Sequence, residues 1–204
     1  MRLILARHGE TECNRQKLVQ GSGTDAELND LGCRQAERLA MALEKVPITA
    51  VYASSMRRAR ATAEAVARPH SLKVVTDPDF REMDTGTLNG QPVKVMGDLL
   101  NNYFADGNND ASQFRMPGGE SLGEIADRTW KATQRVVSLH PKGDVVVVSH
   151  HLVTLMIICR AMGLNLGYFR RMRMGVAAMS ILEFKDGKAG LSLLNDTCHL
   201  DGLV

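Results

Sequence analysis

The sequence predicts an α/β fold, a three-layer α/β/α sandwich in which helices cover both faces of a central sheet. Short apolar runs of strand length alternate along the chain with longer segments whose apolar residues recur at helical spacing. The clearest strand is Val145 to Val148, a continuous β-branched run typical of a strand buried on both faces. Polar residues interrupt this framework where strands end, which is the place where α/β proteins carry their chemistry.

The first half of the chain alternates strand and helix. Its strands are short apolar runs, and its helices are bounded by residues that cap or end a helix. Asn29 can cap the first helix, and Pro47 ends it, whereas the second helix is rich in alanine. The expected strands are 2–6, 48–53 and 72–76, and the expected helices are 30–44 and 57–68.

The second half continues the pattern and ends in a hairpin. Ser121 and Glu124 have the spacing of a capping box at the start of a long amphipathic helix. Near the end of the chain, Lys185 to Lys188 reads as a tight turn between two strands. The expected helices are 120–139 and 152–162, and the expected strands are 145–148, 179–184 and 191–195.

The segment 91–119 departs from this rhythm. A short helical stretch is followed by runs of asparagine, glycine and proline, so we expect one domain over 1–204 with a cap-like insertion at 91–119. The alternatives are a disordered segment and a plain surface loop. The large apolar residues of the segment either line a substrate pocket or hold the cap to the core; they are Met96, Tyr103, Phe104 and Met116.

Composition excludes several classes of protein. The net charge of +2 with 24% charged residues gives no global field for nucleic acid or a membrane surface. The four cysteines form no CxxC pair, which favours reduced thiols over a disulfide framework. The first apolar run is too short for a signal peptide, and no run approaches 18 apolar residues. We therefore expect a cytoplasmic protein that binds neither membrane nor nucleic acid.

Two histidines follow predicted strands, and both have polar neighbours. His8 comes directly after Arg7 at the end of the first strand, and His150 follows the apolar run 145–148. Either histidine alone fits a buried structural role, but two of them at strand ends favour a nucleophile and its helper.

Clustered arginines and acidic residues follow the second and third predicted strands. Arg57, Arg58 and Arg60 lie at a helix start, where backbone N–H groups already favour anions, although helical spacing lets only one or two point the same way. Glu82 and Asp84 follow the third strand and can supply a proton. A solvated basic face and surface acids are the plainer alternatives. Together the groups indicate phosphoryl transfer through histidine.

These motifs, in this order, resemble the histidine phosphatase superfamily, in its phosphoglycerate mutase-like branch. The matching segments are Arg7-His8-Gly9-Glu10-Thr11, 54–63, Glu82 with Gly86 and Gly90, 119–121, and Ser149-His150. The resemblance implies a mostly parallel sheet, an active site at the carboxyl ends of the strands, and chemistry that needs no metal and no cofactor.

The resemblance also implies roles for individual residues. His8 resembles the phosphorylated nucleophile, and Glu82 matches the proton donor. Arg7 and Arg58 resemble the arginines that bind the phosphoryl group, and His150 the histidine that donates a hydrogen bond to it. Weaker matches suggest substrate-side contacts at Asn14, Gln20 and Gly21, and His151 stands where relatives often have glycine, so it either narrows the pocket or turns outward.

The sequence favours hydrolysis over phosphoryl isomerisation. A mutase needs extra cations over its pocket, but the insertion has two, Lys94 and Arg115, against three acids, Asp98, Asp106 and Asp110. We expect a phosphatase acting on a small phosphorylated metabolite, as a monomer or homodimer, similar to the α-ribazole phosphatases or the broad-specificity phosphatases. A phosphoglycerate mutase-type isomerase is the alternative, and a non-catalytic phospholigand-binding protein is a third reading.

Overall fold

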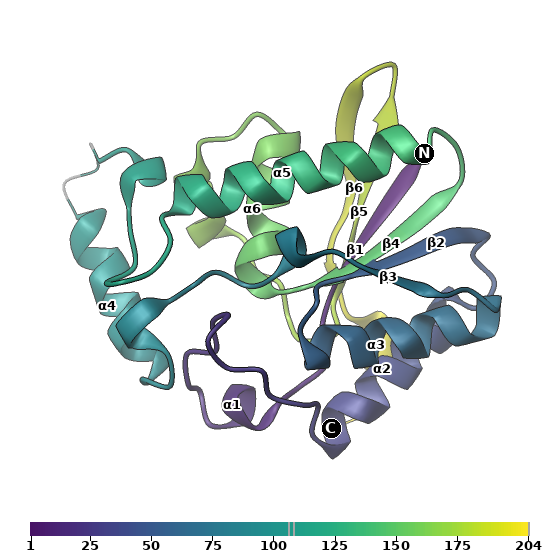
Figure 1. Ribbon diagram of the computed structural model, residues 1–204, viewed down its shortest axis with the longest axis horizontal. Helices are drawn as coiled ribbons and strands as arrows, with labels where there is room; N and C mark the ends of the chain where they lie inside the picture. The colour runs from purple at the N-terminus through teal and green to yellow at the C-terminus, as the bar shows by residue number, and fades with distance from the viewer. Residues whose placement is uncertain (106, 108, 204) are drawn as a thin grey trace.

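The computed structural model describes residues 1–105, 107 and 109–203, and its strands form one six-stranded mixed sheet in the order β3-β2-β4-β1-β5-β6 (Figure 1). The bounds are β1 Arg2–Arg7, β2 Ile48–Ala53, β3 Val74–Thr76, β4 Asp144–Ser149, β5 Met179–Lys185 and β6 Lys188–Asp196. Strands β1 to β4 pair in parallel, whereas β5 and β6 add an antiparallel hairpin beside β1. The predicted mostly parallel sheet is confirmed.

Helices cover both faces of this sheet. The bounds are α2 Asp30–Leu43, α3 Arg57–Ala67, α5 Leu122–Leu139 and α6 His151–Ala161. Successive residues of β1 point to opposite faces, so Leu3 packs in the core cluster with Ile125 of α5, and Ile4 in the cluster with Leu39 of α2. Figure 1 shows α5 on one side of the sheet and α2 with α3 on the other.

Helix caps agree with the sequence signals. The Asn29 side chain accepts from the Gly32 N–H, and Ser121 and Glu124 form a reciprocal capping box at the start of α5. A further helix, α1 (Glu12–Arg15), was not expected, because a single turn leaves no periodic apolar pattern. Thr11 caps α1 through a second box with Asn14, and this turn follows directly on the segment after β1.

Two strands begin two or three residues away from their predicted starts. β3 begins at Val74 rather than at 72, because Ser71 is left-handed (φ 55°) and the Leu72 N–H still donates to Ala67 at the end of α3. β6 begins at Lys188 rather than at 191, because Asp186 and Gly187 both have positive φ (49° and 74°) and form a two-residue hairpin turn. The antiparallel edge is therefore longer than expected.

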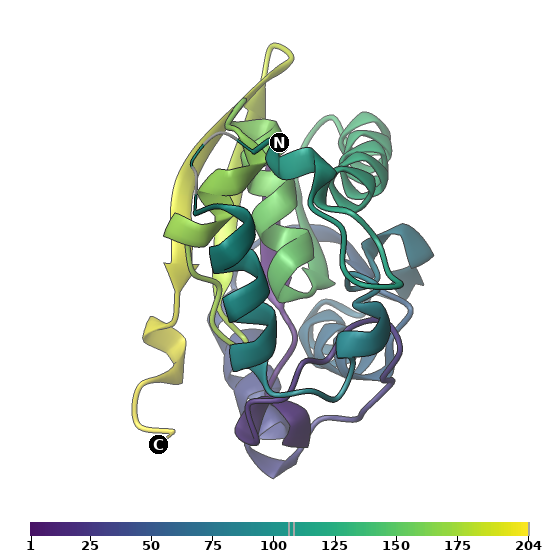
Figure 2. The ribbon, with the colours of Figure 1, turned by 90° about the vertical axis from the view of Figure 1, so that its left-hand side faces the viewer.

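The insertion forms α4 (Val93–Tyr103), which lies on the same side of the molecule as α1 (Figure 2). Main-chain hydrogen bonds connect the two segments: the Val19 N–H donates to Gln91 at 2.7 Å, and the Val93 N–H donates to Lys17 at 2.9 Å. A β-bridge between Leu18 and Pro92 lies between them. The start of the insertion is thus fixed to the loop that follows α1.

The rest of the insertion packs on the core. Tyr103 and Phe104 stack against Phe114 and against each other, and Met116 is fully buried. Asp106, one of the acids counted above, lies outside the described residues. Within the described part of the chain, no helix is long and apolar enough to cross a bilayer.

Candidate active site

The sheet order explains why the two histidines meet. β1 and β4 are parallel neighbours in which Arg7 pairs with Ser149, so both strands deliver their next residue at the same edge. The His8 N–H donates to the Ser149 carbonyl at 3.0 Å, and the ring centroids of His8 and His150 lie 5.2 Å apart. β2, on the other side of β4, ends one residue before Ser54 and leads into α3.

A close backbone approach holds the segment that carries His8. A Cβ on Gly9 would lie 2.4 Å from the Gly32 carbonyl oxygen, and a Cβ on Gly32 would collide with the main chain of Glu10. No larger side chain fits at either position without moving the main chain. The turn after β1 therefore packs directly on the first turn of α2.

The contacts of His8 fix its proton on one ring nitrogen and direct the other at Arg58. Its Nδ1 lies 2.7 Å from the Gly9 carbonyl oxygen, and because a carbonyl only accepts, Nδ1 carries the proton. Nε2 therefore has a lone pair, and the Arg58 Nε–H lies 3.3 Å from it. Burial, followed by the charges of Arg58 and Arg7, lowers the His8 pKa well below its usual value. The ring is thus a neutral imidazole beside a cation.

Among the three clustered arginines, Arg58 is the one that faces the histidines. It is fully buried, and it donates to the carbonyls of Thr24 at 2.8 Å and Gly21 at 3.4 Å. Burial lowers its pKa to about 10, so it stays charged at neutral pH. Arg57 and Arg60 are exposed and pair with surface glutamates, as their positions on α3 require.

His150 is held through Ser54. The His150 Nε2 lies 2.8 Å from the Ser54 hydroxyl, which also accepts the Met56 N–H at 3.3 Å. The serine hydroxyl can donate to Nε2 as well, and in that tautomer the histidine proton lies on Nδ1. Nδ1 is buried and has no partner among the described residues. Burial lowers the His150 pKa well below its usual value, which keeps this donor neutral.

Glu82 lies at the amino end of α6. One carboxyl oxygen accepts the Met83 N–H at 2.9 Å, and the other accepts the Leu152 N–H at 3.4 Å. Burial raises the Glu82 pKa above its usual value, in spite of the arginines nearby. The carboxyl group is therefore suited to hold a proton at a pH where an exposed glutamate has lost it.

Arg128 of α5 holds the loop that carries Glu82, and the sequence analysis did not identify it. Its guanidinium donates to the carbonyls of Asp79, Arg81 and Glu82 and forms a bidentate ion pair with Glu120. Glu120 in turn accepts the main-chain N–H of the residue two positions after Glu82. No local pattern marks the contact with the loop, because its carbonyls lie more than 40 residues before Arg128 in the chain.

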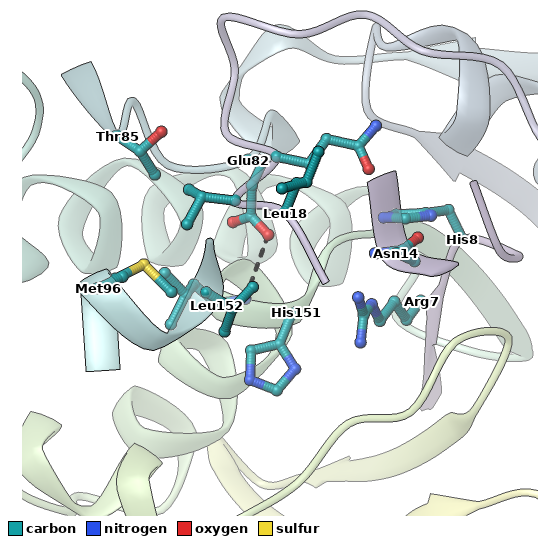
Figure 3. A pocket seen from close by; sticks show the side chains of 12 residues that line it. Arg7, His8, Asn14, Leu18, Glu82, Thr85, Met96, His151 and Leu152 are labelled. Carbon is teal, nitrogen blue, oxygen red and sulfur yellow. Dashed lines mark hydrogen bonds between the residues drawn. The ribbon is translucent and has the colours of Figure 1, made fainter. Parts of the chain in front are cut away.

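These side chains surround a cavity of about 250 Å³ (Figure 3). Its lining residues are Arg7, His8, Asn14, Leu18, Val19, Gln20, Glu82, Thr85, Val93, Met96, His151 and Leu152. Arg58 and His150 are not in the lining and lie next to His8, and Gly21 contributes only its carbonyl to Arg58. Met96 is the one insertion residue of the four proposed for a pocket that lines it, and His151 turns inward.

Gln20 and Thr85, which line the cavity, each have a polar atom without a hydrogen bond within the described part of the chain. The Gln20 Nε2 and the Thr85 hydroxyl are buried without a hydrogen-bond partner in the described residues. Thr85 was missed by the sequence analysis, and only its position three residues after Glu82 signals it. Within 1–105, 107 and 109–203, no three histidine, cysteine or acidic side chains gather as a metal site requires.

Comparisons with known proteins agree on one family. The family model for the histidine phosphatase superfamily (branch 1) matches residues 3–197. The chain is 29% identical to the Probable phosphoglycerate mutase GpmB of Yersinia enterocolitica, over 98% of this chain and 95% of that protein.

Solved structures with the same fold carry phosphatase names. Phosphoserine phosphatase of Entamoeba histolytica, in complex with 3-phosphoglyceric acid, superposes with a TM-score of 0.85 at 25% identity over 98% of each chain. The alpha-ribazole phosphatase of Shigella flexneri gives 0.82 at 26% identity over 96% of each chain. Because the family model covers nearly the whole sequence, this chain belongs to the histidine phosphatase superfamily, branch 1.

Proposed function

We propose that this protein is a phosphatase that hydrolyses a small phosphomonoester through a phosphohistidine intermediate on His8. The observation that carries the proposal is the contact of His8 Nδ1 with the Gly9 carbonyl, which leaves the lone pair on Nε2 with Arg58 beside it. A neutral imidazole next to a fixed cation suits attack on a phosphoryl group.

In the first step, the Nε2 lone pair of His8 attacks phosphorus, and the bond between phosphorus and the ester oxygen breaks. Arg7 and Arg58 stabilise the negative charge on the phosphoryl oxygens, and the Nδ1–H of His150 donates to one of them. Protonated Glu82 transfers its proton to the leaving oxygen, which departs as an alcohol.

In the second step, the Glu82 carboxylate takes a proton from water, which attacks phosphorus. The bond from phosphorus to Nε2 breaks, so phosphate leaves and His8 and protonated Glu82 are restored. Asn14, Gln20 and Thr85 line the cavity and are placed to contact the substrate, with Gly21 acting through its carbonyl on Arg58.

The charge around the cavity supports hydrolysis over isomerisation. Lys94 and Arg115, the cations of the insertion, are paired with Asp98 at 3.0 Å and with Glu124, and neither lines the cavity. A bisphosphorylated intermediate therefore lacks the additional cations that would retain it. The similarity to a protein named as a mutase makes the distinction worth testing directly.

The assay for this distinction uses 3-phosphoglycerate with a trace of 2,3-bisphosphoglycerate. We expect release of inorganic phosphate with little 2-phosphoglycerate, because water reaches phospho-His8 more readily than a returning acid does. Phosphate and both phosphoglycerates are measured in the same time course. Isomerisation that outpaces phosphate release would overturn the proposal in favour of a mutase.

The pH dependence follows from the two shifted groups. Attack requires neutral His8, whose pKa is lowered below 6.5, so activity falls only when the pH drops well below that value. Leaving-group protonation requires protonated Glu82, whose pKa is raised above 4.5, so activity declines as the pH rises through the raised value. A plot of kcat/KM against pH, corrected for substrate ionisation, should be bell-shaped. An acid limb centred at or above 6.5 would contradict the assignment of His8.

The proposed setting of this activity is the cytoplasm, with 1–204 acting as one domain and 91–119 as its cap. All four cysteines are free thiols in the structure, which suits a reducing compartment.

A further inference from the structure

His151, the first residue of α6, shares its hydrogen-bond acceptor with Arg7. The His151 Nδ1 lies 3.0 Å from the Met174 carbonyl oxygen, and the Arg7 Nη1 donates to the same oxygen at 2.8 Å. Both side chains line the cavity, and Figure 3 shows them on the same side of it, with Glu82 opposite. Their positions relative to each other are therefore set by one main-chain atom.

This contact determines the proton position of His151. A carbonyl oxygen only accepts hydrogen bonds, so Nδ1 carries the proton, and Nε2 carries a lone pair whenever the ring is neutral. Burial, followed by the charge of Arg7, lowers the His151 pKa to about 4, so the ring is neutral at physiological pH. Nε2 has no hydrogen-bond partner among the described residues, and its residue lines the cavity.

The neighbours of His151 limit what Nε2 can recognise. Arg7 is the only cation in the lining at neutral pH, and the proposed reaction commits it to the phosphoryl group. A carboxylate on the leaving group would face the Nε2 lone pair and would have no cation to pair with, because Arg7 binds the phosphoryl group. An ammonium group would be repelled by Arg7. A neutral hydroxyl donates to Nε2 without either cost.

Two lysines beside the cavity do not line it. Lys17 and Lys94 line a neighbouring surface hollow that shares Arg7 and Leu18 with the cavity. Lys94 is engaged by Asp98 on the next turn of α4. Apart from Arg7 and the proposed proton donor, the lining on the cavity side of Leu18 therefore consists of apolar and uncharged polar side chains. Arg7 is the cation that a leaving group meets there.

We propose that His151 is a specificity-determining residue whose Nε2 accepts a hydrogen bond from a hydroxyl of the leaving alcohol, so that the preferred substrates are phosphomonoesters of polyols rather than of hydroxy acids. This inference rests on the proposed phosphatase function and adds the substrate class. It assigns the side chain at this position to the leaving group and not to the phosphoryl group.

The test on the unmodified protein compares two substrates that share a three-carbon skeleton. Glycerol 3-phosphate has a hydroxymethyl group where 3-phosphoglycerate has a carboxylate. Both substrates carry the C2 hydroxyl, so they differ only in the terminal group near His151. We expect kcat/KM for glycerol 3-phosphate to be about tenfold higher, the effect of one hydrogen bond from its terminal hydroxyl. Equal values, or a preference for 3-phosphoglycerate, would overturn the inference.

Substitutions then assign the preference to His151. His151→Ala should bring the ratio of the two kcat/KM values to within about threefold of unity, and His151→Lys should favour 3-phosphoglycerate by pairing its carboxylate. His140→Ala is the matched control, since His140 precedes the amino end of β4, opposite the cavity, and the ratio should stay at its original value. A ratio that persists in His151→Ala would also overturn the inference, even if the lysine variant does not fold.

A separate readout distinguishes failure of the inference from failure of the proposed function. The unmodified enzyme is mixed with p-nitrophenyl phosphate, quenched, and assayed for an acid-labile phosphohistidine. A labelled enzyme that favours 3-phosphoglycerate refutes only the role of His151. An unlabelled enzyme without phosphate release refutes the phosphatase function, and the inference with it.

Discussion

Replacing His8 with alanine should abolish turnover, with a fall in kcat of at least about 10⁴-fold, because the substitution removes the group proposed to form the bond to phosphorus. The neighbouring His150 keeps its lone pair on Nε2, where the Ser54 hydroxyl occupies it at 2.8 Å, so it does not substitute. Phosphate release from p-nitrophenyl phosphate measures turnover. Acid-labile labelling of the quenched enzyme measures the intermediate, which should disappear in His8→Ala.

The control for this variant removes a histidine elsewhere. His140→Ala should keep both turnover and labelling, since His140 contacts only Tyr52 among the aromatic and titratable neighbours described. Thermal unfolding of both variants shows whether they are folded. Turnover by folded His8→Ala at the rate of the unmodified enzyme would refute the nucleophile assignment.

Replacing Glu82 with glutamine should produce an effect that depends on the leaving group. Glutamine keeps an oxygen to accept the Met83 N–H but cannot transfer a proton to a departing alkoxide. With glycerol 3-phosphate, kcat/KM should fall by about 10²- to 10⁴-fold, the usual contribution of a general acid. With p-nitrophenyl phosphate, whose leaving group is stable as an anion, the fall in kcat/KM should be no more than about tenfold.

Asp84→Asn is the matched control for Glu82→Gln. Asp84 is an exposed acid two residues away, and an asparagine can still accept the Gly86 N–H that Asp84 binds at 2.9 Å. Its kcat/KM should match that of the unmodified enzyme for both substrates. Equal losses for both substrates in Glu82→Gln would argue against proton donation and for a role of Glu82 in shaping the cavity.

Much of the fold follows from local signals in the sequence. The run 145–148 predicted a strand buried on both faces, and it occupies the middle of the sheet because apolar residues face both helix layers. Asn29 marked the start of α2 at Asp30, and Ser121 caps α5, which begins at Leu122 and not at the predicted 120, since a cap depends only on its own first turn. The antiparallel pairing of the last two strands depended on a turn, and its glycine was visible in the sequence.

The site could be predicted in its members but not in its contacts. Spacing on α3 allowed only one or two of three arginines to face inward, and burial of Arg58 beside His8 required the position of β2 in the sheet. The direction of His151 was open, because it depends on a carbonyl 23 residues later in the chain. Arg128 binds carbonyls that lie far away in the chain, and the Thr85 hydroxyl has no hydrogen-bond partner among the described residues. A single sequence has no marker for either feature.

The bridge between Leu18 and Pro92 fixes the main chain of the insertion without fixing its side chains. The hydrogen bonds on either side of it join backbone to backbone, so they persist through most substitutions of the residues involved. Side chains of α4, such as Val93 and Met96, can therefore be exchanged while the main-chain link between the insertion and the loop after α1 is kept. In this arrangement, point mutations in α4 change the side chains at the cavity and leave the segment around His8 as it is.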